Sequence, residues 1–465
     1  MGKIRRSRLA TAVAVACAAV AGTVVMPADA VAKPIAAPAD FNGDGYQDLV
    51  VPAPTAKVGT KDGAGAVVVL YGSRTGISTL RKAVITQDSA GVPDAAEAND
   101  SFGAATAFAD LDRDGYSDLV VGAPDEDLGG LANAGGVTVL WGGRSGLAAG
   151  SALPITQVRN GRYGLDVAAV RDSGGARILA GGYDGWNEFS GPFGRNGSVG
   201  THTLGRGTAS ALVTDYLMQG DGYAVPVITS ARVGGSSGGL VYVSPGNHPV
   251  PLPIDGTTTA TGDVNGDGYD DLVVGDPDEP ITGTYGHKGG QITVWYGGAT
   301  GLAATPVRIS QDTAGVVGTS ARPNEFGTAV AVADLNKDGV GDIVVSAPGQ
   351  TQNGKGLAGA VVVIPGTKTG VPGAGSYQLS QETASVPGVS EQSDRFGSTL
   401  TVGDVRSDGR PDVIIGAYGE DSHNGAVWVL PGSAIGPTGT GSVELTANKL
   451  GLAGENPRVG GFQPA

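Results

Sequence analysis

Residues 110–124 read DLDRDGYSDLVVGAP, and close copies of this stretch recur along the chain. The copies begin at Asp40, Asp110, Asp263, Asp334 and Asp404. Neighbouring starts lie 70 or 71 residues apart, except for an interval of 153 residues after the second copy. That interval has room for two degenerate units, at about 160–205 and 206–250, which makes seven units. A fixed period of this length indicates a repeat architecture.

Each unit contains about four short runs of β-type sequence and no convincing amphipathic helix. The Asp-rich stretch leads into one run, and a second follows, as in GAVVVLYG at 65–72. A third is short, as in VITQ at 84–87. Three copies are preceded, eight residues upstream, by a Phe-Gly pair: Phe102-Gly103, Phe326-Gly327 and Phe396-Gly397. Four strands in each of seven units predict an all-β chain, folded as a seven-bladed β-propeller.

The order of these motifs resembles the FG-GAP repeat of the integrin α-subunit head. In that family a Phe-Gly pair, an Asp-rich loop and Gly-Ala-Pro follow one another, as they do here. The resemblance covers almost all of residues 35–465 and implies a propeller domain over residues 31–465. The departures are the two degenerate units, Pro52 in the first Gly-Ala-Pro and Ala417-Tyr418 in the last. A binding or adhesion module, rather than an enzyme, is what the resemblance implies.

The C-terminal tail resembles the start of a further repeat. Residues 457–462 read PRVGGF, after which only three residues remain, whereas the first repeat has no Phe-Gly start. We therefore expect the tail to supply part of the first unit and to close the ring, which would leave few strand edges exposed.

The N-terminus is typical of an export signal. Basic residues at positions 3, 5, 6 and 8 precede an uncharged stretch over 9–25, and Ala28-Asp29-Ala30 offers a cleavage site. Residues 1–30 are therefore predicted to be a signal peptide, with an uncleaved anchor as the alternative. We expect the mature chain to be secreted or associated with the cell surface, monomeric, and not inserted in a membrane after cleavage.

Composition restricts the partners. The chain of 465 residues carries a formal net charge of −15, which argues against binding nucleic acid. Its single cysteine, Cys17, lies in the predicted signal, so the mature protein would have no disulfide. We expect an extracellular protein or glycan as the ligand.

The Asp-rich loops carry the pattern Asp-x-Asx-x-Asp-Gly-x-x-Asp, which predicts calcium sites. Oxygen ligands fall at positions 1, 3, 5 and 9, the backbone carbonyl of position 7 is a further ligand, and Gly at position 6 permits the sharp turn. The alternative is an Asx turn without metal. The predicted ligands are Asp40, Asn42, Asp44, Tyr46, Asp48, Asp110, Asp112, Asp114, Tyr116, Asp118, Asp263, Asn265, Asp267, Tyr269, Asp271, Asp334, Asn336, Asp338, Val340 and Asp342. In the fifth loop Arg406 takes position 3, so we expect no calcium there.

No catalytic residues are predicted. The Gly-x-Ser-x-Gly match at 234–238 is followed by a β run instead of the helix that a nucleophile elbow needs. The aromatic segment 182–193 is interpreted as filling the shortened third unit, with sugar or peptide stacking as the alternative. Two other functions remain open: a secreted hydrolase or lyase that uses the central face of the propeller, and a cell-wall scaffold.

Overall fold

The structure is a computed structural model. It describes residues 39–205, 211–218, 224–230, 240–243, 250–280, 286–368, 373–452, 454 and 456–461. Residues 36–465 form one compact unit, and the predicted signal at 1–30 lies outside the described residues. The described residues are mainly strands and loops, with two short helical segments, α1 (Glu420–His423) and α2 (Ala447–Leu450). Within the described part of the chain, no helix has the length and apolar character needed to cross a membrane.

Six sheets contain four strands each, and in every sheet the strands pair antiparallel in their order along the chain. Numbered in chain order, the second, third and fourth sheets comprise β4 (Ala105–Ala109), β5 (Asp118–Ala123), β6 (Gly136–Trp141) and β7 (Ala149–Ala152); β8 (Asp166–Asp172), β9 (Gly175–Gly182), β10 (Gly185–Ser190) and β11 (Thr201–Gly205); and β12 (Ala211–Met218), β13 (Ala224–Ser230), β14 (Leu240–Val243) and β15 (Val250–Asp255). The fifth, sixth and seventh comprise β16 (Thr258–Gly262), β17 (Asp271–Asp276), β18 (Gln291–Trp295) and β19 (Val307–Ile309); β20 (Val330–Ala333), β21 (Asp342–Ala347), β22 (Ala360–Ile364) and β23 (Tyr377–Leu379); and β24 (Thr399–Gly403), β25 (Asp412–Ala417), β26 (Ala426–Leu430) and β27 (Val443–Thr446).

The first sheet has only three described strands, β1 (Leu49–Ala53), β2 (Ala66–Leu70) and β3 (Lys82–Ile85). In the repeat, β1 corresponds to the second strand of the other sheets, because the Asp-rich loop leads directly into it. The prediction of a seven-bladed propeller is therefore wrong in number: the described residues form six four-stranded blades and one three-stranded sheet. The sequence of the first repeat has no Phe-Gly start before its Asp-rich loop, and the described part of the chain begins at Ala39, so no strand is described before β1.

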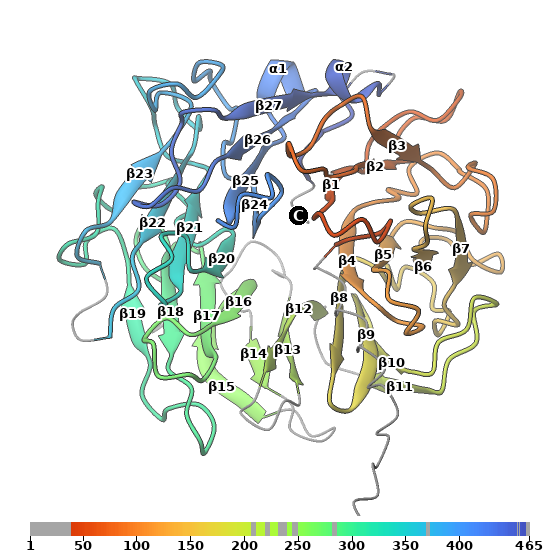
Figure 1. The fold of residues 1–465 in the computed structure, drawn as a ribbon. Coiled ribbons are helices and arrows are strands. Elements are labelled where there is room, and N and C mark those ends of the chain that lie inside the picture. Colours follow the sequence, from red (N-terminus) through yellow and green to blue (C-terminus); the bar gives the residue numbers. More distant parts are fainter. Residues whose placement is uncertain are drawn as a thin grey trace, which may run out of the picture. The chain divides into compact units, whose positions relative to one another are not determined.

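The sheets follow one another around a ring, with one strand of each complete blade nearest the axis (Figure 1). Buried side chains of adjacent sheets form shared clusters, as Val67 of the first sheet does with Leu119 of the second. Val51 of the first sheet shares a cluster with Ile414 of the seventh, so the first and last sheets also pack together. The protein is therefore an all-β β-propeller.

The C-terminal tail contacts the first sheet, as the sequence predicted. Val459 is fully buried and forms a bridge with Gly425, and the Gly460 N–H donates to the Pro52 carbonyl at 3.1 Å. Phe102-Gly103 makes the equivalent contacts at the start of the second sheet. Val459 thus occupies the phenylalanine position of the repeat, while Phe462 lies outside the described residues.

The Phe-Gly pair is needed because two backbones meet closely at each blade junction. The Phe102 side chain is completely buried, and the Gly103 N–H donates to the Gly122 carbonyl at 2.9 Å. Gly103 has a φ of +93°, and a Cβ there would lie 2.8 Å from the Ala66 carbonyl oxygen. A larger residue at this position would push the blades apart.

Candidate metal loops and central pocket

Each predicted loop joins the strand nearest the axis to the second strand of its sheet, and the first loop leads into β1. The loops run over residues 40–48, 110–118, 263–271 and 334–342, and all twenty predicted ligand residues are described. The glycine at position 6 has a left-handed backbone in all four, with φ of +86° to +89°. The turn that the sequence predicted is therefore present.

The position-9 aspartate connects its loop to the sheet. Asp271 is fully buried, and its two carboxylate oxygens accept the N–H groups of Val264 at 2.8 Å and Gly297 at 2.7 Å. A Cβ on Gly297 would lie 2.1 Å from the Asp270 carbonyl oxygen, so only glycine fits there. Equivalent pairs of hydrogen bonds are made by Asp48, Asp118, Asp342 and Asp412.

Burial raises the pKa of these position-9 carboxyls, to about 7 for Asp48 and Asp118 and to about 6 for Asp271. The backbone hydrogen bonds oppose this shift, while nearby carboxylates add to it. A nearby cation would favour the charged form. Sequence analysis assigned position 9 only to metal binding and missed this structural role, which the glycine after the third strand of each unit would have indicated.

The remaining aspartates fold the loop onto itself. Asp263 accepts hydrogen bonds from the N–H groups of Gly266, Asp267 and Gly268 at 2.6, 3.1 and 2.7 Å. The Tyr269 N–H donates to Asp267 at 3.0 Å, which brings the position-7 peptide beside the position-5 carboxylate. Asp40 and Asp334 are held in the same manner.

This donor set suits a hard divalent cation. Carboxylate, amide and carbonyl oxygens are the ligands that calcium prefers, and they converge within nine residues. In the loop with four aspartates, oxygens of Asp110, Asp112 and Asp114 all lie within 4.8 Å of one another. In the fifth loop Arg406 Nη1 lies 3.7 Å from Asp408 Oδ2, so a positive charge of the protein already stands beside the carboxylates.

Glutamines at the start of the inter-blade loops are a feature that sequence analysis missed. Gln87, in the VITQ run, donates through Nε2 to Glu126, and Gln381 donates to Glu420 at 2.8 Å. Burial raises the pKa of both glutamates to about 8. At the equivalent place Gln311 donates to neutral Gln350 at 2.8 Å. Two of these junctions therefore bury an acid where the third has a half-buried amide.

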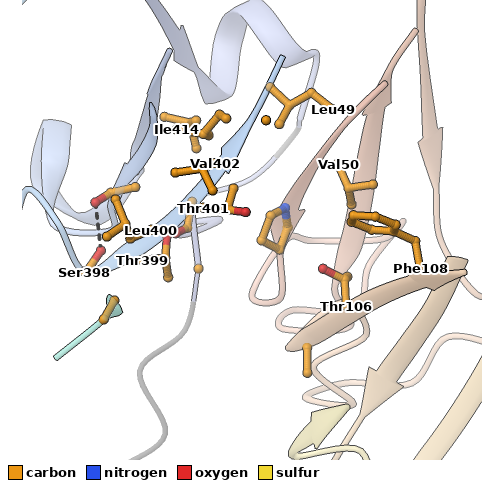
Figure 2. Close-up of a pocket in the computed structure, with 18 of the residues that line it drawn as sticks. Leu49, Val50, Thr106, Phe108, Ser398, Thr399, Leu400, Thr401, Val402 and Ile414 are labelled. Atoms are coloured by element: carbon orange, nitrogen blue, oxygen red, sulfur yellow. Dashed lines mark hydrogen bonds between the residues drawn. The ribbon is translucent and has the colours of Figure 1, made fainter. Parts of the chain in front are cut away.

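A pocket of about 510 Å3 lies beside β1, the first described strand of the first sheet. It is lined by β1, β4 and β24, with Val50 and Phe108 on one side and Thr399 and Thr401 on the other (Figure 2). Much of the lining is small or apolar. The ionisable side chains among its described lining residues are Asp48, already hydrogen-bonded to two peptide groups, and Asp166.

The aromatic segment of the third unit packs inward. Trp186 and Phe189, both in β10, are buried, and the Phe189 ring stacks on His202 at a centroid distance of 4.6 Å. This favours the interpretation that the segment fills the shortened blade. The Gly-x-Ser-x-Gly match at 234–238 lies outside the described residues.

Together, the fold and the loops define a β-propeller built from repeats with Asp-rich turns. The family model described as FG-GAP repeat matches residues 34–70, 102–140, 256–295, 326–364 and 396–430. The chain is an FG-GAP repeat protein.

Similar proteins include integrin α subunits. The chain is 33% identical over 210 residues to integrin alpha pat-2 of Caenorhabditis briggsae, covering 42% of this chain and 15% of that protein. It is 34% identical over 166 residues to phosphatidylinositol-glycan-specific phospholipase D of Bos taurus, covering 35% and 18%. The chain thus spans less than a fifth of these relatives. A periplasmic gluconolactonase structure from Pseudomonas aeruginosa aligns with a TM-score of 0.47 at 15% identity, covering 86% of this chain and 96% of that one.

Proposed function

We propose that this protein is a non-enzymatic binding module of the extracellular space, stabilised by calcium, whose ligand is a protein or a glycan. The observation that carries the proposal is the recurrence of one ligand set at the same junction of several blades. Similarity to integrin α subunits supports a binding role, and the predicted signal at residues 1–30 supports an extracellular location.

Where a loop binds calcium, the residues of that loop would hold the ion. In the fifth sheet these are the side chains of Asp263, Asn265, Asp267 and Asp271, with the carbonyl of Tyr269. The ion supplies positive charge to a cluster of carboxylates and cross-links the ends of a turn. Both effects would hold the loop in place, so the expected role of the metal is structural.

The pocket chemistry supports binding over hydrolysis. General acid–base hydrolysis of glycosides uses a pair of carboxyl groups that face the substrate. Asp48 uses both oxygens to hold backbone N–H groups, which leaves Asp166 as the other described carboxylate in the pocket lining.

One binding screen in two conditions tests the proposed function. The mature protein is screened against arrays of glycans and matrix proteins, with 2 mM calcium (roughly the top of the affinity range of extracellular calcium modules) or with EGTA. We expect a saturable ligand that is retained with calcium and weakened by EGTA, because chelation loosens the loops. Equal binding in both conditions would contradict the calcium component, and turnover of the bound ligand would contradict the non-enzymatic assignment.

A further inference from the structure

Two arginines of the third sheet reach the Asp-rich loop of the second sheet. Arg171 lies in β8, and Arg195 lies in the turn between β10 and β11. Arg171 Nη1 donates to Asp110 Oδ2. Arg195 donates through Nε to Asp112 Oδ2 and through Nη2 to Asp114 Oδ2, both at 2.7 Å. Three of the four carboxylates in this loop are therefore paired with guanidinium groups.

Arg195 is held in this position by further contacts. Its Nη2 also donates to the Gly142 carbonyl at 3.1 Å, and its guanidinium carbon lies 5.6 Å from the centre of the Trp141 ring. A guanidinium that binds two carboxylates, a carbonyl and an aromatic face is fixed in orientation, because its donors form a rigid planar fork. The Arg195 side chain is 48% exposed, but it contacts two carboxylates of the loop, where Arg81 contacts one.

The same carboxylate oxygens would be needed by a metal ion. Asp112 Oδ1 accepts the Asp114 N–H at 3.2 Å, and Asp114 Oδ1 accepts the Tyr116 N–H at 3.0 Å. The Oδ2 atoms remain for a cation, and these are the atoms that Arg195 binds.

In the other loops, the position-5 carboxylate has a different partner. Asp267 Oδ2 accepts a hydrogen bond from Asn265 Nδ2 at 3.1 Å. Asp338 Oδ2 accepts one from Asn336 Nδ2 at 3.0 Å. A neutral amide can turn its oxygen toward an arriving cation, whereas a guanidinium has no acceptor to offer. In the first loop Arg81 contacts one carboxylate, Asp44, at 3.2 Å.

We propose that Arg171 and Arg195 take the place of calcium in the loop at Asp110, so that this loop is neutralised by the neighbouring blade. The proposal rests on the proposed function, in which the loops at Asp40, Asp263 and Asp334 bind calcium. The full chain then binds three calcium ions, and the second and third sheets are joined by ion pairs that do not depend on calcium.

The test compares matched variants by equilibrium dialysis against calcium, with metal analysis of the folded protein. We expect three ions in the wild type, three in Asp114→Asn and two in Asp267→Asn. Both substitutions remove the position-5 carboxylate, in the first case from the loop that the arginines neutralise and in the second from a loop proposed to bind calcium. Replacing both arginines, as Arg171→Gln with Arg195→Gln, is expected to raise the number to four. Arg81→Gln serves as the control and is expected to leave three.

Different results separate the two proposals. Four ions in the wild type, with a loss of one in Asp114→Asn, would overturn the substitution of calcium by arginine and leave the proposed function intact. No bound calcium in the wild type would overturn the calcium component of the proposed function itself. The Asp114→Asn comparison does not require removal of the arginines, so it decides the matter even where the double variant does not fold.

Discussion

The third and sixth sheets hold the carboxylates between their first two strands in different ways. In the sixth sheet, β20 and β21 are joined by the loop 334–341, whose carboxylates are held by backbone N–H groups. In the third, β8 and β9 are joined by Ser173-Gly174, and the carboxylate of Asp172 is paired with Arg177 of β9. The degenerate repeat has lost the Asp-rich loop and carries an internal positive charge.

The Arg177 site is closed from solvent. The side chains of Arg177 and Asp172 are 6% and 0% exposed, and Arg177 Nη1 also lies 3.5 Å from Glu188. Burial works to raise the pKa of Asp172, but hydrogen bonds from the Ala224 N–H and from Arg177 outweigh it and lower that pKa. One fold therefore accommodates both an Asp-rich loop and a short hairpin with an internal cation, provided that other groups offset the charge of each carboxylate.

The largest expected effect is at Arg177. Arg177→Met would leave Asp172 and Glu188 buried without their cation, and breaking a buried pair in this manner costs about 3–5 kcal/mol. We expect the free energy of unfolding, from urea titration, to fall by that amount with or without calcium. Adding Asp172→Asn should recover part of the loss, and a double variant as unstable as the single one would show that the ion pair is not the cause.

Calcium removal should act on the loops and not on the third sheet. For dissociation constants of roughly 0.1–1 mM, 1 mM free calcium (an order-of-magnitude extracellular level) adds about 0.4–1.4 kcal/mol for each loaded loop. We expect EGTA to lower the melting temperature while the far-ultraviolet circular dichroism below the transition is unchanged. The shift should be smaller in Asp338→Asn. An unchanged melting temperature would mean that the folded loops hold no metal.

At Glu126 we expect a bound proton, and not a cation, to neutralise the buried carboxyl group. Its pKa of about 8, raised by burial, lies above the ordinary 4.5, so the folded state keeps a proton that the unfolded chain releases. Stability from this group is therefore complete below about pH 4.5 and is lost as pH rises toward 8.

We expect Glu126→Gln, which copies the amide found at Gln350, to reduce the fall in unfolding free energy between pH 6 and 7. The reduction is at most about 1.4 kcal/mol per pH unit. Urea titrations at both pH values measure it, with Gln350→Glu as the reciprocal change that should introduce the dependence. Parallel pH profiles in all three proteins would contradict a proton at this junction.

The smallest effect is expected where an ion pair is exposed. Arg81 Nη2 lies 3.2 Å from Asp44, and both side chains are partly open to water. Exposed pairs contribute about 0–1 kcal/mol because solvent screens them. Arg81→Gln should therefore change the urea midpoint little. If Arg81→Gln lowered the free energy of unfolding as much as Arg177→Met does, burial would not explain the difference between the two ion pairs.

The sequence alone determined the propeller class and the turn of each Asp-rich loop. Both follow from local chemistry: the period near 70 residues, the β-type runs, and Gly45 and its equivalents at the point where the backbone must be left-handed. The tail contact with β1 was also predictable, since residues 457–462 resemble the start of a repeat.

Only the tertiary structure decided which groups pair with the acidic side chains. Arg195 lies 81 and 83 residues from the carboxylates that it binds, and Gln87 lies 39 residues from Glu126. Neither pairing has a local motif, because each depends on how one blade packs against the next. The number of complete blades was decided in the same way: pairing between strands, and not the count of repeat motifs, sets how many sheets have four strands.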